Sequence, residues 1–81
     1  MEKRPLSMIA NEIYIDWSQA KSGVYFGAMP YLKAMADLQS IEENYFLDSG
    51  RSVVAYFLAN AQTWRGDVAR RVKKELKGML K

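Results

Sequence analysis

Apolar residues recur at three- and four-residue steps in four stretches of the chain, the spacing that places them on one face of an α-helix. The first stretch predicts a helix over residues 6–19, with Ser7 as its cap and Pro5 just outside. The expected buried face of this helix consists of Leu6, Ile9, Ile13 and Trp17.

A second helix is expected to begin near Pro30, because the fixed φ of proline suits a first helical turn. It fades around Gln39-Ser40. Residues 41–47 are expected to add a further turn and then a packed connector that ends in Tyr45-Phe46-Leu47. The apolar side of the helix is formed by Tyr31 or Leu32, Met35 and Leu38.

The third helix has the clearest pattern. Asp48-Ser49-Gly50 offers a cap at its start. The residues that follow are apolar nearly all round the helix, so it is expected to be central and the most buried of the four. Its apolar face comprises Val53, Val54, Phe57, Leu58 and Ala61.

The fourth helix is predicted from Thr63, a good cap, with Asp67 favoured in the first turn by the helix dipole. Gly66 costs such a helix about 1 kcal/mol relative to alanine. The alternative is therefore a third helix that runs to Trp64 and a break at Gly66. The apolar stripe of this segment consists of Trp64, Val68, Val72, Leu76 and Met79 or Leu80.

Residues 20–28 do not fit a helical pattern, and two glycines bracket the triplet Val24-Tyr25-Phe26 within them. A loop with three large apolar side chains is expected to tuck them into the core. We therefore predict an all-α fold, a compact bundle of about four short helices with one ordered aromatic loop at residues 20–28. A chain of 81 residues is expected to form a single helical domain, residues 1–81.

Histidine and cysteine are both absent from the chain. Their absence removes the commonest general base, the commonest metal ligand and any thiolate or disulfide. Zinc, haem and iron–sulfur sites therefore do not fit this composition. Only carboxylates remain as ligands, which suit Mg²⁺ or Ca²⁺, and we expect no cofactor and no metal site.

No catalytic group of residues is apparent either. Ser49 and Ser52 have no histidine to activate them, and Lys33 is expected on the exposed side of its helix. Glu42 and Glu43 are adjacent, so they would point away from each other on a helix. The sequence therefore predicts that the protein is not an enzyme and has no catalytic residue.

The net charge of +3 is unevenly spread along the chain. Residues 1–64 hold five basic and seven acidic residues, whereas residues 65–81 hold seven basic and two acidic ones. Five of the basic residues recur at three- and four-residue steps and would form one continuous ridge on the last helix. This basic ridge, the candidate contact surface for nucleic acid or an acidic partner, consists of Arg70, Lys73, Lys74, Lys77 and Lys81.

Two interpretations of the basic ridge stay open. It could contact phosphates, with release of counterions and salt-sensitive binding, and the last two helices would then resemble a helix-turn-helix. It could also be a solvated outer face, which is the favoured interpretation, since lysines are favoured near a helix C-terminus. Sequence-specific reading of DNA is disfavoured, because Gly66 and Asp67 lie where base-contacting residues usually do.

The aromatic residues also allow two interpretations. They could form a stacking platform for single-stranded nucleic acid. Their spread over several segments favours tyrosines at the edge of the core with wet hydroxyl groups. Trp17 and Trp64 are expected to anchor the core. The residues in question are Tyr14, Tyr25, Phe26, Tyr31, Tyr45 and Tyr56.

Targeting signals are not apparent in the chain. The longest apolar run, residues 53–59, is far shorter than the roughly 20 residues that span a bilayer. The first residues lack the apolar stretch of a signal peptide. We expect a cytoplasmic protein, in a bacterial cell or an infected host cell, with no membrane partner.

One further pattern spans most of residues 9–80. It lies in Val24–Leu32, Ala34-Met35, Asp48–Gly50, Tyr56–Ala61, Thr63–Gly66, Ala69-Arg70 and Lys74–Lys77. These segments resemble short uncharacterised proteins of prophages and mobile elements of Gram-positive bacteria, which would have a glycine where this chain has Phe46. The resemblance implies a small accessory protein that acts by binding, on host defence or replication machinery. It assigns no catalytic or binding residue.

Three kinds of partner follow from these observations. The leading hypothesis is a protein partner of unknown identity, because the chain is small and has no evident chemistry. The alternative is a nucleic acid bound by the basic ridge. A homodimer is the third, since a thin core and many aromatic residues favour self-association.

Overall fold

The computed structural model describes residues 4–81, and four helices make up most of this part of the chain. They are α1 (Leu6–Ser18), α2 (Met29–Ala36), α3 (Gly50–Ala59) and α4 (Asp67–Leu80). A 3₁₀ turn, η1 (Phe26–Ala28), leads directly into α2, and the strands β1 (Asn44–Tyr45) and β2 (Asp48–Ser49) precede α3. The mainly helical fold is confirmed. The all-α prediction is wrong in one respect, because β1 and β2 pair as a small antiparallel hairpin.

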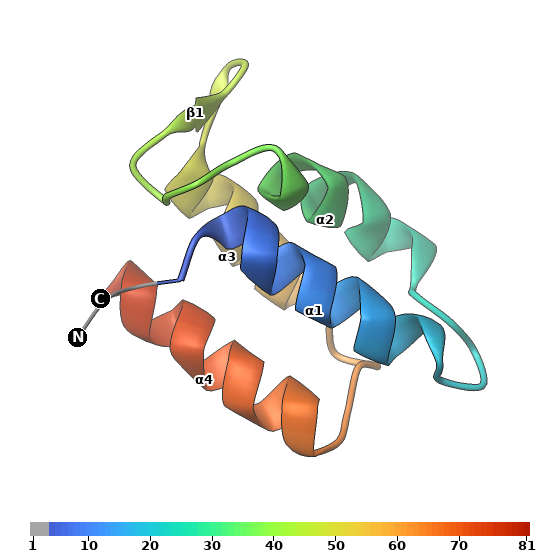
Figure 1. The fold of residues 1–81 in the computed structure, drawn as a ribbon. Helices are drawn as coiled ribbons and strands as arrows, with labels where there is room; N and C mark the ends of the chain where they lie inside the picture. Colours follow the sequence, from blue (N-terminus) through green and yellow to red (C-terminus); the bar gives the residue numbers. More distant parts are fainter. Residues whose placement is uncertain (1–3) are drawn as a thin grey trace.

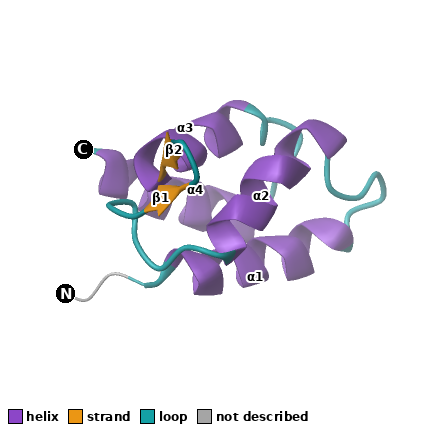
Figure 2. Cartoon of the chain, turned by 90° about the horizontal axis from the view of Figure 1, so that it is seen from above, coloured by secondary structure: helices purple, strands orange, loops and turns teal. Residues whose placement is uncertain are grey.

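Consecutive helices run in opposite directions, as Figure 1 shows. α1 packs against α2 and α4, and α3 packs against the same two helices from behind. The hairpin lies at one end of the bundle, and the loop that precedes η1 lies at the other (Figure 2). This arrangement places the start of α1 beside the end of α4.

Three aromatic side chains fill the centre of the core. The rings of Trp17 and Trp64 stack with their centroids 5.7 Å apart and 20° between their planes. Phe57 meets both of them edge-on, at 6.2 Å from Trp17 and 6.4 Å from Trp64. All three side chains are buried, so the prediction that both tryptophans anchor the core is confirmed.

The start of α1 differs from the prediction. Ser7 lies inside the helix and does not cap it, and Pro5 occupies the position before the first helical residue. The amide of Leu6 donates to the Gln39 carbonyl at 3.1 Å, and that of Ser7 donates to the Leu38 carbonyl at 2.8 Å. The chain just beyond α2 therefore satisfies backbone donors that a side-chain cap would otherwise satisfy.

The starts of α2 and α3 agree with the sequence. Pro30 lies in the first turn of α2, and Ser49 caps α3 through its hydroxyl oxygen, which accepts from the Ser52 amide at 3.0 Å. α2 ends at Ala36, a few residues earlier than predicted. α3 buries Gly50, Val53, Val54 and Phe57, whereas Tyr56 on its outer side is 52% exposed, so α3 is not buried on all sides.

The boundary between α3 and α4 lies further along the chain than Thr63. α3 ends at Ala59 and α4 begins at Asp67, so residues 60–66 form a seven-residue connector in which Thr63 is exposed. Gly66 directly precedes α4 with a φ of 116°, a conformation that a side chain disfavours. The predicted cap at Thr63 is wrong. The alternative placed the break at Gly66 correctly, but its third helix, expected to run to Trp64, ends at Ala59.

Two loops expose side chains that were expected to pack. In the loop at residues 20–28, Val24 packs against the core, but Tyr25 is 43% and Phe26 is 79% exposed. In the predicted packed connector, Tyr45 is half-buried, whereas Phe46 and Leu47 project into solvent from the tip of the hairpin. Each prediction is confirmed for one side chain and wrong for two, because a local apolar pattern does not show whether the core has room for the side chains.

Candidate binding surfaces

The serine and glutamate side chains considered for chemistry have structural roles. The Ser49 hydroxyl donates to the Ser52 hydroxyl at 3.0 Å, at the start of α3. Glu43 Oε1 accepts from the Gln39 amide at 2.7 Å. Lys33 is exposed on α2, as predicted. Within residues 4–81, no three histidine, cysteine, aspartate or glutamate side chains come together as a metal site.

The basic ridge forms one side of α4, as the spacing predicted. Arg70, Lys74, Lys77 and Lys81 are exposed, and Lys73 is half-buried at the edge of the ridge. The opposite side of α4 packs into the core through Ala69, Val72, Leu76 and Met79. A shallow depression follows the outer side of the helix and is lined by Arg70, Lys73, Lys74, Lys77, Gly78 and Lys81.

Lys73 is tied into the fold. Its Nζ donates to the carbonyl of Trp64 at 2.7 Å and lies 5.9 Å from the centroid of the Trp64 ring. Burial lowers the pKa of the Lys73 ammonium, and the nearby charges of Lys77 and Arg65 lower this pKa further. Lys73 therefore satisfies a carbonyl in the connector ahead of α4, which the spacing of the ridge did not reveal.

The remaining members of the ridge differ in their partners. Arg70 pairs with Asp67 one turn earlier, and both side chains are largely exposed. Among residues 4–81, no acidic side chain lies within ion-pairing distance of Lys74, Lys77 or Lys81. Three lysines on one side of α4 are therefore left without neutralising neighbours in the described part of the chain.

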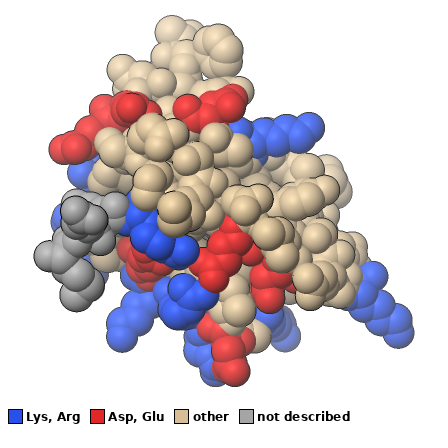
Figure 3. Space-filling view, in the orientation of Figure 1, with Lys and Arg blue, Asp and Glu red and all other residues tan. Residues whose placement is uncertain are grey.

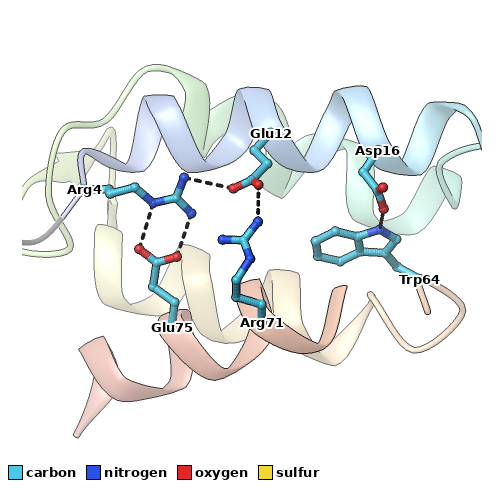
Figure 4. Close-up of polar contacts among 6 residues, drawn as sticks. All are labelled: Arg4, Glu12, Asp16, Trp64, Arg71 and Glu75. Carbon is cyan, nitrogen blue, oxygen red and sulfur yellow. Dashed lines mark hydrogen bonds and ion pairs between the residues drawn. The ribbon is translucent and has the colours of Figure 1, made fainter. Parts of the chain in front are cut away.

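The other charged residues of α4 face α1 and are paired. Arg4 donates to both carboxylate oxygens of Glu75, at 2.9 and 2.6 Å, and its Nη1 lies 2.8 Å from Glu12 Oε1. The second oxygen of Glu12 accepts from Arg71. Figure 4 shows this alternating chain of charges between the two helices. The pairing of Glu75 with Arg4 keeps the only acidic side chain in the second half of α4 away from the ridge.

The hairpin carries a second distinctive surface. Phe46 is 85% exposed, and Leu47 is fully exposed beside it. Phe46 has a φ of 56°, in the left-handed region that is a genuine outlier for a bulky residue. The glycine expected at position 46 from the resemblance would adopt this φ without strain. The centre of Tyr45-Phe46-Leu47-Asp48 has no residues that favour a hairpin turn. The glycine expected in place of Phe46 was therefore the one feature of the sequence that pointed to a turn here.

The surroundings of the hairpin tip are acidic. Glu42, Glu43 and Asp48 are exposed next to Phe46 and Leu47 in the sequence. In Figure 3 the hairpin projects as uncharged surface at the top of the molecule, above acidic side chains, while most basic side chains in view lie over α4 at the lower edge. The molecule therefore has an acidic end with an apolar tip and a basic side formed mainly by α4.

The predicted helix-turn-helix is not supported by this geometry. The connector between α3 and α4 has seven residues, against the three or four of that motif. The first turn of α4 presents Asp67, which pairs with Arg70, where a recognition helix contacts bases. The aromatic residues do not gather on the basic ridge either, since none lines its depression.

No family model, no curated protein and no solved structure matches this chain. The roles of its residues are therefore argued from its own geometry. No helix among residues 4–81 is both long enough and apolar enough to cross a membrane.

Proposed function

We propose that this protein functions by binding another protein, and that the hairpin tip is the contact that anchors the complex. The observation that supports the proposal is the pair Phe46 and Leu47, which are adjacent, apolar and almost completely exposed. Isolated exposed apolar residues are common on protein surfaces. A pair of exposed apolar residues at the end of a projecting hairpin, one of them an aromatic residue in a strained backbone conformation, is uncommon. Backbone strain of this kind clusters at functional positions.

The free energies involved favour an anchoring role. A left-handed φ costs a non-glycine residue about 1–2 kcal/mol. Complete burial of a phenylalanine or leucine side chain contributes roughly 1.5–3 kcal/mol each. Burial of Phe46 and Leu47 in a pocket of a partner would therefore exceed the cost of holding Phe46 in its conformation. Aromatic anchors that fill a pocket commonly supply most of the affinity of an interface.

The charges around the tip indicate the chemistry of the partner surface. Glu42, Glu43 and Asp48 would face the rim of a pocket that receives Phe46 and Leu47, so we infer an apolar pocket with basic residues around it. The same carboxylates disfavour a membrane as the partner, because the cytoplasmic leaflet is negatively charged. The resemblance to prophage proteins suggests a host protein, in a defence or replication complex, as the owner of this pocket.

Affinity capture with paired variants tests the proposal. The immobilised wild-type protein is compared with the double variant Phe46→Gly, Leu47→Ser and with the control Phe26→Ser. Phe26 is 79% exposed, and it begins η1, directly after the loop at the opposite end of the bundle from the hairpin. We expect a partner that the wild type and the control retain and the double variant releases. Retention of the same proteins by all three would contradict the proposal, and so would the absence of any saturable partner.

A further inference from the structure

The two sides of α4 differ in how their charges are paired. On the side of α4 that faces α1, the charged side chains are neutralised, as in the pairs of Arg4 with Glu75 and Arg71 with Glu12. On the outer side of α4, Lys74, Lys77 and Lys81 have no such partners among residues 4–81. Like charges three and four residues apart destabilise a helix by about 0.2–0.5 kcal/mol per pair. The protein therefore bears a cost on this surface that it avoids on the other side of the same helix.

Favourable placement near a helix C-terminus does not explain the whole surface. The helix dipole favours lysines only in the last turn, which accounts for Lys77 and Lys81. Arg70 and Lys74 lie further back along α4, yet they belong to the same line of charge. Arg65, in the connector, extends basic surface to the start of the helix, beside Arg70 and Lys73.

A glycine lies among these charges. Gly78 lies in the last turn of α4, where glycine is less favourable than alanine by at most the roughly 0.8–1.0 kcal/mol that it costs in a helix interior. A Cβ atom built at Gly78 would meet nothing within 4 Å, so the fold does not require its absence. Gly78 lines the same depression as Lys74, Lys77 and Lys81. The missing side chain leaves uncovered backbone between lysines, at a point where a bulky anionic group could approach closely.

We propose that the outer side of α4 is a binding site for the phosphate backbone of double-stranded nucleic acid, without recognition of base sequence. The site comprises Arg70, Lys74, Lys77 and Lys81, and the exposed backbone at Gly78 lies among them. From Arg70 to Lys81 it extends about 16 Å, at the ordinary rise of 1.5 Å per helical residue. This site is separate from the hairpin tip and does not depend on the proposed protein partner.

The make-up of the site favours a duplex over other anionic partners. Single-stranded nucleic acid is usually bound through aromatic stacking, and no aromatic side chain lines the depression. A protein interface needs an apolar centre, whereas this surface consists of charged residues and one glycine. An anionic membrane is disfavoured because the apolar side of α4, which would have to enter the lipid, is packed into the core.

Fluorescence anisotropy with a labelled 20-base-pair duplex of mixed sequence tests the site. Four phosphate contacts predict a slope of about −3.6 when the logarithm of the association constant is plotted against that of the salt concentration. The variant Lys74→Gln, Lys77→Gln removes two phosphate contacts. The magnitude of the slope should therefore decrease by about 2, and the affinity at 0.1 M salt should decrease tenfold or more. Gly78→Leu keeps every charge and should lower the affinity at all salt concentrations without altering the slope.

The matched control is Lys21→Gln, Lys33→Gln. Both residues are exposed, both lie outside α4, and the change in net charge is the same as in the α4 variant. This control should retain the wild-type slope. No binding at 50 mM salt would overturn the proposal. An equal loss in both double variants, or stronger competition by polyglutamate or a single strand than by unlabelled duplex, would also overturn it.

Discussion

The indole N–H of Trp64 donates a hydrogen bond to Asp16 Oδ2 at 2.9 Å, and it joins α1 to the connector ahead of α4 across 48 residues of chain (Figure 4). Trp64 is buried against Trp17, and the only polar atom of its side chain bonds to a carboxylate at the edge of the core. Together with the pairs made by Glu12, this bond fixes the position of α4 against α1.

Loss of this bond should destabilise the protein. Asp16→Ala would leave the buried indole N–H without a partner, which costs about 1–3 kcal/mol. Asp16→Asn keeps an acceptor oxygen and should cost less. Urea unfolding followed by tryptophan fluorescence measures both variants, with Asp37→Ala, an exposed aspartate beyond α2, as the control. Equal stabilities for Asp16→Ala and the control would show that the bond contributes nothing.

Acid should weaken the protein partly through Glu12. The hydrogen bond from Arg71 and the charge of Arg4 hold the pKa of Glu12 below its ordinary value of 4.5, although burial acts in the opposite direction. A carboxylate with a lower pKa in the folded state contributes stability that is present above about pH 4.5 and is lost as the pH falls through the folded-state pKa.

The variant Glu12→Gln isolates this effect. It should be less stable than the wild type at pH 7, and its stability should fall less steeply below pH 4.5. Urea midpoints measured from pH 7 to pH 3 provide the comparison. Glu42→Gln is the control, because Glu42 is exposed and makes no ion pair within residues 4–81. Parallel profiles for Glu12→Gln and the wild type would refute the role of Glu12.

Relief of strain at the hairpin tip should stabilise the protein. Phe46→Gly removes the side chain that disfavours a φ of 56°, and the gain should be about 0.5–1 kcal/mol after the added freedom of the unfolded chain is subtracted. For a domain of this size, 1 kcal/mol corresponds to a rise in Tm of about 4–8 °C. Leu47→Gly has no positive φ to relieve and should not raise Tm. A fall in Tm for Phe46→Gly would argue against strain at this turn.

Two glycines should respond to the same substitution in opposite directions. Gly78→Ala should stabilise α4 by up to about 1 kcal/mol, because a Cβ there meets open space in the last turn of the helix. In Gly50→Ala, the new Cβ would lie 2.9 Å from the Cα and carbonyl oxygen of Ile41 and from the Ser40 carbonyl oxygen. Backbone atoms cannot move aside cheaply, so a loss of about 1–3 kcal/mol is expected. Thermal unfolding compares the two variants, and a stabilised Gly50→Ala would contradict the close packing at the start of α3.

Local chemistry was sufficient to predict much of the fold. The three- and four-residue spacing of apolar residues located all four helices, because that spacing alone decides which side chains can share a face. The stretch Asp48-Ser49-Gly50 was recognised as offering a cap, which Ser49 supplies, and Trp17 and Trp64 were recognised as core residues. The position of the basic ridge on one side of α4 also followed from spacing.

Features that depend on distant parts of the chain were not predictable in this way. The first amides of α1 are satisfied by carbonyls of residues 38 and 39, so no cap was needed at Ser7. The hairpin forms although its turn lacks favourable residues, and it exposes Phe46 and Leu47 that looked like packing residues. The neutralisation of Arg71 and Glu75 depends on Glu12 and Arg4, more than 55 residues earlier in the chain.

The sequence by itself therefore determined the approximate position of each helix, most of the residues that enter the core and which side of the last helix is basic. These properties depend on periodicity within a few turns of chain. The tertiary structure alone decided that Lys73 binds the Trp64 carbonyl, that Glu75 faces Arg4 and that Lys74, Lys77 and Lys81 stay unneutralised among residues 4–81. It also decided that an aromatic tip projects from the acidic end. The reason is that charge pairing and exposure depend on which helices become neighbours.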